Sequence, residues 1–293
     1  MSFELNCEQR KTSMKRIAML PAALCSLSLA LLSANAQPAA TSTAANPLSQ
    51  AERAANLYGR EILSSDNQQV GKIDNVVVDL ESEHILYVVL NTSRGKAAVP
   101  PEVIGQSTGN TLRANAAKTK IESAPQFTSN NDTPQQLGQA SFVNQVYQYF
   151  GQSAWWQGSA GADQGAFHNV HKLNQLIGMN VEDVNNRSIG KISNVVVDMP
   201  TGRLLYVVFS PAASLNLGNN LYAMPSDAFT LSSDQKHLVT GVDTQKLAGA
   251  PHFANNSWPS LTDSSFASQV YQYYGKQAWF NNGTAGSIKP TGR

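Results

Sequence analysis

The chain repeats itself, and this duplication limits the possible folds more than any other feature of the sequence. Residues 57–90 align without gaps on residues 176–209 at an offset of 119, with 15 identities in 34 positions. Residues 142–156 match residues 266–280 at 9 of 15 positions. Two copies of roughly 100 residues fit tandem domains better than a solenoid, because solenoid repeats are shorter and need at least three copies.

Each copy contains short apolar segments that are typical of β-strands. The valine runs at residues 76–78 and 195–197 are each followed by a second apolar segment, at residues 84–90 and 203–209. Shorter strands are expected at residues 96–100, 111–114, 220–225 and 237–240. Five or six strands in about 70 residues, joined by tight turns, predict a small antiparallel barrel or sandwich. Its core should include Val76, Val78, Tyr87 and Val89.

Both copies share one motif, which runs from Gly59 to Pro100 and from Gly178 to Pro225. It reads Gly-Lys-Ile-x-Asn-Val-Val-Val-Asp, a turn, Leu-Tyr-Val-Val, and then Ala-(Val/Met)-Pro. This pattern resembles the PRC-barrel, a domain named from the photosynthetic reaction centre H subunit and also carried by a ribosome maturation factor. The resemblance implies a six-stranded barrel with a binding or assembly role, and it implies no catalytic residue. The segments that follow each motif resemble tails found after this barrel in exported bacterial proteins.

The expected fold class is therefore mainly β, with two tandem small antiparallel PRC-type β-barrels, each followed by an amphipathic α-helix. We expect eight segments, which are a signal peptide at 1–36, a flexible lead at 37–56, PRC-barrel 1 at 57–123, a helical tail at 124–156, a Gly/Ser/Ala-rich flexible linker at 157–170, PRC-barrel 2 at 171–249, a second helical tail at 250–280 and a flexible C-terminus at 281–293.

The first 36 residues have the pattern of a secretory signal. Met14-Lys15-Arg16 precedes the apolar stretch 17–32, and Ala34-Asn35-Ala36 provides a small-x-small cleavage site. We expect cleavage near Ala36 and a periplasmic or secreted bacterial protein, with translation starting at Met1 or Met14. Membrane association after cleavage is expected to be weak or absent, because the apolar stretch is short for a membrane span.

Composition excludes several classes of function. Lys and Arg number 21 against 20 Asp and Glu, so the basic surface that nucleic-acid binding requires is missing. Both cysteines, Cys7 and Cys25, lie in the predicted signal peptide, so the exported chain has no thiol for a disulfide, a metal or catalysis. The remaining polarity comes from amides, with 25 Asn and 21 Gln.

Few motifs point to chemistry. Gly71-Lys72 and Gly190-Lys191 lack the preceding glycine of a phosphate loop, and we interpret each glycine as starting a strand after a turn. His168 and His171 have helical spacing for a shared metal, but no cysteine supports them. We interpret the acidic stretch at residues 79–83 beside His84 as a solvated turn. No metal, cofactor or catalytic residue is predicted.

The segment after each barrel contains an amphipathic helix with an aromatic face. Apolar residues of 142–150 lie within one arc, the same arc recurs at 266–274, and glycines at 151 and 275 are suited to left-handed caps. This face either packs on its own barrel or remains partly exposed and anchors a partner. The candidate partner-binding residues are Tyr147, Trp155, Trp156, Tyr271 and Trp279.

Three functions remain possible. The leading hypothesis is an exported, non-catalytic binding or assembly module whose partner is an envelope protein. The first alternative is a carrier of a small apolar or quinone-like ligand held between a barrel and its tail helix, which an apolar pocket would favour. The second alternative is an enzyme, which a buried acid–base pair in a cleft would favour.

Overall fold

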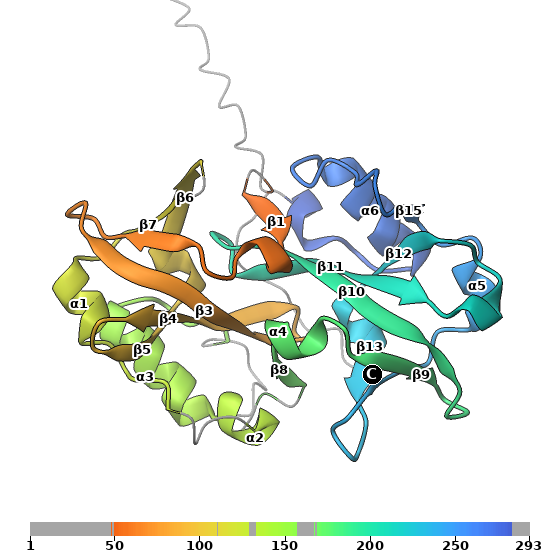
Figure 1. The fold of residues 1–293 in the computed structure, drawn as a ribbon, viewed down its shortest axis with the longest axis horizontal. Coiled ribbons are helices and arrows are strands. Elements are labelled where there is room, and N and C mark those ends of the chain that lie inside the picture. Colours follow the sequence, from red (N-terminus) through yellow and green to blue (C-terminus); the bar gives the residue numbers. More distant parts are fainter. Residues whose placement is uncertain are drawn as a thin grey trace, which may run out of the picture. The chain divides into compact units, whose positions relative to one another are not determined.

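The computed structural model describes residues 48, 50–109, 111–128, 133–156, 167 and 169–282, without the side chains of residues 106–108 and 282. The predicted signal peptide, most of the predicted lead and linker, His168, and nearly all of the predicted C-terminal segment lie outside the described residues. The described part is mainly β, as expected (Figure 1).

The first copy consists of short strands followed by helices (Figure 1). Its elements are β1 (Ala51–Arg53), η1 (Ala54–Asn56), β2 (Glu61–Leu63), β3 (Gln69–Asp79), β4 (His84–Thr92), β5 (Gly95–Val99), η2 (Pro101–Val103), β6 (Ile104–Thr108), β7 (Thr111–Ala114), α1 (Lys118–Glu122), α2 (Pro134–Leu137) and α3 (Ala140–Phe150). Residues 51–56 therefore form regular structure. This corrects the prediction that the flexible lead extends to residue 56.

The second copy has a similar order of elements (Figure 1). They are β8 (Val170–Lys172), α4 (Leu173–Leu176), β9 (Asn180–Asp183), β10 (Ser188–Asp198), β11 (Arg203–Pro211), η4 (Ala213–Leu215), β12 (Asn220–Met224), η5 (Ser226–Ala228), β13 (Phe229–Leu231), β14 (Leu238–Thr240), α5 (Thr244–Leu247), β15 (His252–Ala254), α6 (Ser264–Tyr273) and η6 (Trp279–Asn282).

The duplication is clearest in two long hairpins, β3–β4 and β10–β11. Val76 pairs with Val88 in the first hairpin, and Val195 pairs with Val207 in the second, which is the same register at the offset of 119. Each hairpin also has two register shifts at equivalent positions. Such bulges bend a strand and increase its twist, so the two hairpins have the same local shape.

Gly71 and Gly190 occupy equivalent places on β3 and β10. A Cβ atom at either position would overlap the backbone carbonyl oxygen of the partner strand, at Asn91 or at Ser210. Each glycine therefore lies inside a strand and allows two backbones to approach closely, rather than only starting a strand after a turn.

The sheet is mixed, which corrects the antiparallel prediction. Glu61 on β2 pairs with Thr111 on β7 in parallel, and Val181 on β9 pairs with Leu238 on β14 in parallel. Each parallel pair joins segments that are about 50 residues apart, whereas the turn signals of the sequence identify only antiparallel neighbours. Among the described residues the strands form one connected sheet, and its hydrogen-bonded path does not return to its own start.

The first strand of each copy pairs with the other copy. Ala51 on β1 is opposite Asp198 on β10, and Val170 on β8 is opposite Asp79 on β3. These two pairings are equivalent at the offset of 119, so the exchange is reciprocal. His84 on β4 also pairs with its own counterpart, Arg203 on β11. A residue that meets its own counterpart lies beside a pseudo-twofold axis.

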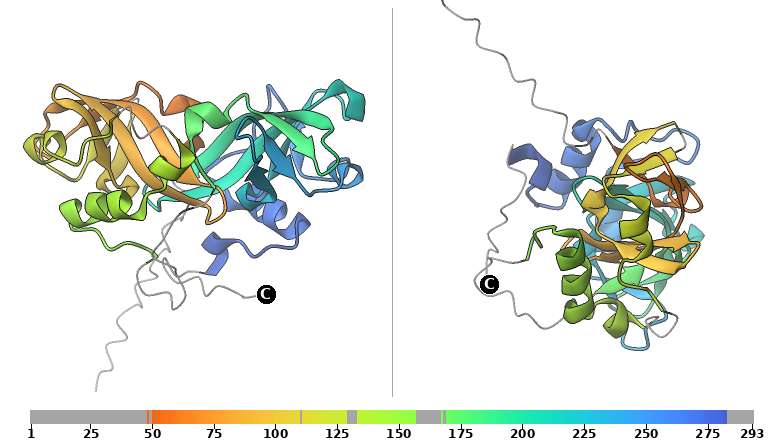
Figure 2. Two further views of the ribbon diagram at one scale, coloured as in Figure 1. Left: turned by 90° about the horizontal axis from the view of Figure 1, so that it is seen from below. Right: turned by 90° about the vertical axis from the view of Figure 1, so that its left-hand side faces the viewer.

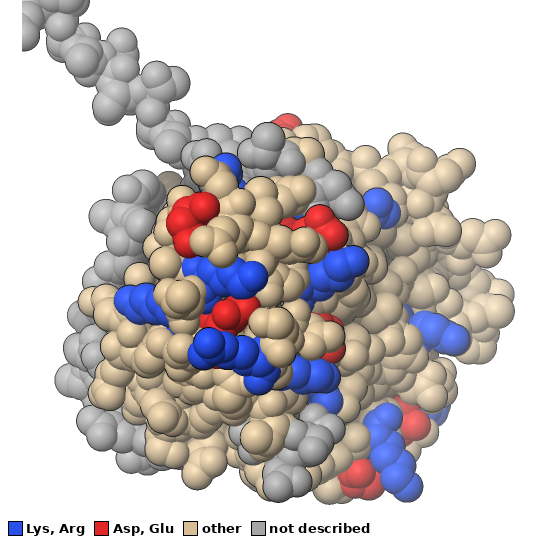
Figure 3. Space-filling view, turned by 60° about the vertical axis from the view of Figure 1, so that its left-hand side comes forward, with Lys and Arg blue, Asp and Glu red and all other residues tan. Residues whose placement is uncertain are grey.

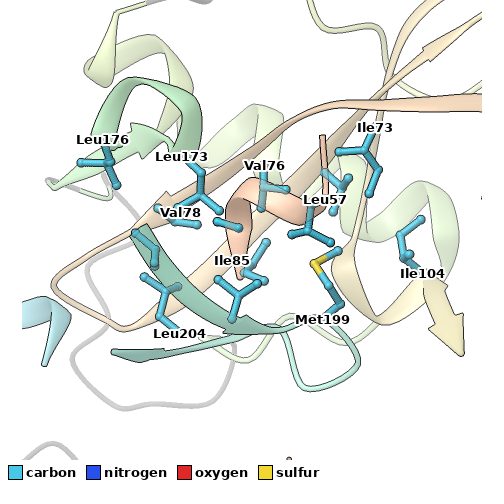
Figure 4. Packing of buried hydrophobic residues seen from close by; sticks show 14 of the residues in the cluster. Leu57, Ile73, Val76, Val78, Ile85, Ile104, Leu173, Leu176, Met199 and Leu204 are labelled. Atoms are coloured by element: carbon cyan, nitrogen blue, oxygen red, sulfur yellow. The ribbon is translucent and has the colours of Figure 1, made fainter. Parts of the chain in front are cut away.

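The largest apolar core is shared between the copies. It contains Val78 and Ile85 from the first copy and Leu173, Met199 and Leu204 from the second (Figure 4). Two separate antiparallel barrels are therefore not confirmed for this chain, because the exchanged strands and the common core connect both copies. The physical reason is that each first strand hydrogen-bonds to the other copy's long hairpin.

The predicted core of the central hairpin is confirmed. Val76, Val78, Tyr87 and Val89 are fully buried. Because side chains alternate along a strand, Val76 and Val78 face the shared core, whereas Tyr87 and Val89 face a second cluster beneath α3.

Helices α3 and α6 are the predicted amphipathic helices, and both lie on the same face of the connected sheet (Figure 2). The apolar side of α3 packs against β4 and β5 through Val143 and Val146. Gly151 has the predicted left-handed conformation, with φ of 70°, and Gly275 has the same φ. Each helix therefore covers the outer face of the strands instead of one end of a barrel.

Among the described residues, no helix is both long and apolar enough to cross a membrane.

Candidate functional site

The turns of the two long hairpins meet at the pseudo-twofold axis. The Ile85 N–H donates to the Gly202 carbonyl at 2.8 Å, and the Leu204 N–H donates to the Glu83 carbonyl at 2.9 Å. Glu83 and Gly202 are equivalent turn residues with φ of 60° and 64°. This left-handed conformation suits glycine and strains glutamate, so Glu83 is held against its backbone preference.

His84 is buried at this meeting point and is electrically neutral. Its ring stacks on Trp155, with ring centroids 3.6 Å apart and an interplanar angle of 9°. Its Nε2 lies 2.8 Å from an Arg203 guanidinium nitrogen, and its Nδ1 lies 2.6 Å from the Ser82 carbonyl oxygen. Because arginine can only donate, Nε2 accepts and Nδ1 carries the proton. Burial, and next the Arg203 charge, hold the pKa of His84 well below its usual value.

Arg203 occupies the equivalent position on the other side of the axis. Its guanidinium lies over the Trp279 ring, 4.9 Å from the ring centroid, and 3.7 Å from a carboxylate oxygen of Glu83. The Tyr271 hydroxyl donates to the same Glu83 oxygen at 3.1 Å. Burial raises the pKa of Glu83, and the Arg203 charge opposes this effect. The turn thus places the Glu83–Arg203 ion pair beside the Trp279 ring and the Tyr271 hydroxyl.

Glu102 lies on the other side of the axis, at the start of η2. Burial raises its pKa to about 7. Its Oε2 atom is buried and has no hydrogen-bond partner among the described residues. A Cβ atom at Gly202 would lie 3.0 Å from its Oε1. Burial raises the pKa of Tyr147 well above its usual value, and the charge of Glu102 adds to this effect.

We name this group of side chains the axial cluster. Its members are Glu83, His84, Glu102, Tyr147, Trp155, Arg203, Tyr271 and Trp279. Several of their polar atoms are buried without a hydrogen-bond partner among the described residues. Buried polar atoms of this kind point to a site for water or a ligand.

Comparison with known proteins places this geometry in a family. The family model of the PRC-barrel domain matches residues 50–117 and 168–240. The chain carries two PRC-barrel domains in tandem. No curated protein matches the chain. The first matched segment begins with the exchanged strand β1, and the second begins with β8. Each PRC copy therefore pairs its own first strand with the other copy.

Four of the five predicted partner-binding residues belong to the axial cluster between the PRC copies. Tyr147 and Tyr271 are fully buried, whereas Trp155 and Trp279 are half-buried. Trp156 lies next to the cluster, where its Nε1 donates to the Asn144 side-chain oxygen at 3.2 Å. The two tyrosines are therefore core residues of the tails, and partner binding by the tryptophans stays a prediction.

The sequence interpretation missed the charged half of the cluster. The stretch around Glu83 and His84 is not a solvated turn, because the opposing turn of the second PRC copy covers it. The available signal was the recurrence of a polar residue, His84 or Arg203, at the first position of an otherwise apolar strand in both copies. Glu102 gave no signal, because a glutamate after Pro-Pro is ordinary in a surface loop.

The described residues hold no group of three or more side chains suited to a metal. His171 is buried in β8, where its Nε2 lies 3.0 Å from the Asn169 side-chain oxygen. Burial lowers the pKa of His171 to about 4. Its neighbours are therefore those of a neutral core histidine, while His168 lies outside the described residues.

Two other surface features are weaker candidates. An open groove of about 550 Å³ lies beside α6, lined by residues that include Phe266, Gln269 and Gln272. It does not have the enclosed apolar walls that suit a quinone-like ligand. Figure 3 shows one face where Lys and Arg mix with Asp and Glu. Charges of mixed sign do not form a patch for one charged partner.

Proposed function

We propose that this tandem PRC-barrel protein is an exported, non-catalytic binding module of the bacterial envelope, and that the axial cluster with its flanking tryptophans is its binding site. The observation that carries this proposal is the convergence of aromatic residues from both tails on one buried polar pair. Trp155 stacks on His84, Trp279 lies under Arg203, and the buried indole N–H of Trp155 lacks a hydrogen-bond partner among the described residues. Half-buried tryptophans of this kind are common at the centres of interfaces.

The PRC-barrel match supports a binding or assembly role. The exchanged strands support a rigid platform, because ordering the two copies together leaves the site pre-organised before a partner binds. Each copy is proposed to correspond to the small barrel of its family, with β2, β3, β4 and β5 as consecutive neighbours in the sheet.

The binding role can be tested with tryptophan variants of the mature chain. We expect W155A and W279A to lose capture of a cross-linked envelope protein that the wild-type chain captures. The matched control is W258A, because Trp258 packs on Phe253 and lies beneath Arg53, neither of which belongs to the axial cluster. Melting temperatures must accompany the assay, since burying an aromatic ring stabilises a fold. Equal capture by W155A, W279A and W258A, at retained folding, would overturn the site assignment.

The export role has its own test. The sequence around Ala34-Asn35-Ala36 predicts that the mature chain begins at Gln37. N-terminal sequencing of the protein from a periplasmic or secreted fraction should therefore begin at Gln37. A mature protein that starts at Met1 or Met14 would contradict this part of the proposal.

A further inference from the structure

The axial cluster has two halves that occupy equivalent places but carry different charges. We count with these halves the adjoining residues Asp227 and Lys276 beside α6, and Gln152 and Gly202 beside α3. Glu102 and Asp227 are both the second residue of a 3-10 helix, η2 or η5, that follows an equivalent strand. The Gln152 N–H donates to the Tyr147 carbonyl at 3.0 Å, and the Lys276 N–H donates to the Tyr271 carbonyl at 2.8 Å. Gln152 and Lys276 therefore hold the same place after α3 and α6.

The half beside α6 is balanced in charge. Lys276 forms an ion pair with Asp227, and Arg203 lies 3.7 Å from Glu83. The Lys276 charge also lowers the pKa of Glu83, against the effect of burial. Two acids and two bases thus compensate one another inside the protein, so this half needs no ion from outside.

The half beside α3 has the acid, Glu102, but no charged base. Gln152 stands where the other half has Lys276, neutral His84 where it has Arg203, and Gly202 where it has Glu83. No Lys or Arg among the described residues forms an ion pair with Glu102. A carboxylate without a cation in a buried place is unfavourable. Gly202 brings no side chain to Glu102, and its backbone packs so closely that a Cβ atom there would lie 3.0 Å from Oε1.

The surroundings of Glu102 suit one kind of ion. Its Oε2 can accept a hydrogen bond, and the Tyr147 hydroxyl, on a side chain that is 1% exposed, also lacks a partner among the described residues. A primary ammonium group has three N–H donors, which match a carboxylate and a phenol oxygen. Glu102 as a residue is partly exposed, whereas its Oε2 atom and the Tyr147 hydroxyl are buried, so binding from solvent requires the Glu102 side chain to rotate.

We propose that the half of the axial cluster beside α3 binds a primary ammonium group, with Glu102 as counter-ion in the place that Lys276 fills for Asp227. The ammonium group belongs to a small alkylamine or to a lysine side chain of the partner. The inference rests on the proposed function, since it names the chemistry that the binding site recognises.

The binding should strengthen as pH rises. Protonated Glu102 cannot act as counter-ion, and with its pKa of about 7 its ionised fraction rises about tenfold between pH 6 and pH 8. The neighbouring groups do not change this expectation. His84 stays neutral and Tyr147 stays protonated over this range, while Arg203 stays charged.

The test is a titration of the mature full-length chain with n-butylamine hydrochloride at pH 8 and constant ionic strength, with n-butanol as the neutral probe. The backbone amide of Gly202, followed by NMR, reports on binding next to Glu102. We expect a saturable shift with butylamine and none with butanol. The dissociation constant should be about tenfold weaker at pH 6.

Two variants separate the site from general charge effects. E102Q removes the counter-ion, and Q152K supplies the cation from within the chain, so both should lose at least tenfold in butylamine affinity. E61Q is the control, because Glu61 is an exposed acid of the same copy that lies 3.7 Å from Lys72. Melting curves check that each variant is folded, and Q152K is expected to melt at a higher temperature than wild type.

A shift that is equal for butylamine and butanol, or that persists in folded E102Q and Q152K, overturns the proposal. A lysine peptide that binds more tightly than butylamine, and loses binding when its lysine is acetylated, identifies the source as a partner's lysine. Equal affinity identifies a free amine. Because this titration contains no partner protein, its failure would leave the tryptophan-dependent capture, and hence the proposed function, untouched.

Discussion

Replacing Leu204 by Ala tests whether the two PRC copies fold as one unit. Leu204 is fully buried in the core that both copies share (Figure 4). Removing three buried carbon groups costs about 2.4 kcal/mol in transfer free energy. The cavity that remains raises the total loss to about 3–4 kcal/mol of unfolding free energy. For a chain of this size, such a loss lowers the melting temperature by about 6–16 °C.

The assay is differential scanning calorimetry of the mature chain, together with the equivalent variant Ile85→Ala in the first copy. Ile85 is also fully buried in the shared core, at the position equivalent to Leu204. If the copies unfold together, each variant shifts one common transition by a similar amount. Val184→Ala is the control, because Val184 is 69% exposed and its change should leave the transition in place. Two transitions, of which each variant shifts only one, would refute the shared core as the basis of stability.

Two further predictions follow from single positions. Burial raises the pKa of Glu102 from 4.5 to about 7 in the folded chain, so the stability that its protonated form contributes is present below about pH 4.5 and is lost as pH rises through 7. Urea unfolding at pH 5 and pH 8 should show this loss of unfolding free energy in wild type and a smaller loss in E102Q. An equal change in unfolding free energy for both proteins would contradict the burial of Glu102. Gly190→Ala should lower the unfolding free energy by about 1–3 kcal/mol, because its Cβ would overlap the Ser210 carbonyl. Gly241→Ala is the control and should change the unfolding free energy little, because the space around Gly241 is open. Equal effects of the two substitutions in chemical denaturation would argue against the close approach of the strands.

The sequence alone determined the repeat, the hairpins and the helices of this protein. Valine runs at 76–78 and 195–197, with turn residues after them, specify local antiparallel pairing, since each strand meets the next one along the chain. The aromatic face at 142–150 and the cap at Gly151 specify α3 in the same local way. The sequence also identified four aromatic side chains of the axial cluster, which are Tyr147, Trp155, Tyr271 and Trp279.

The tertiary structure decided which copy each strand joins and which polar groups become buried. The copies are so similar that β3 and β10 offer the same partner to a first strand, so the sequence does not distinguish pairing within a copy from exchange between copies. The parallel pairs and the meeting of His84 with Arg203 also depend on contacts between residues far apart in the chain. Charges that a local pattern assigns to solvent became buried because a second copy of the same turn covers them.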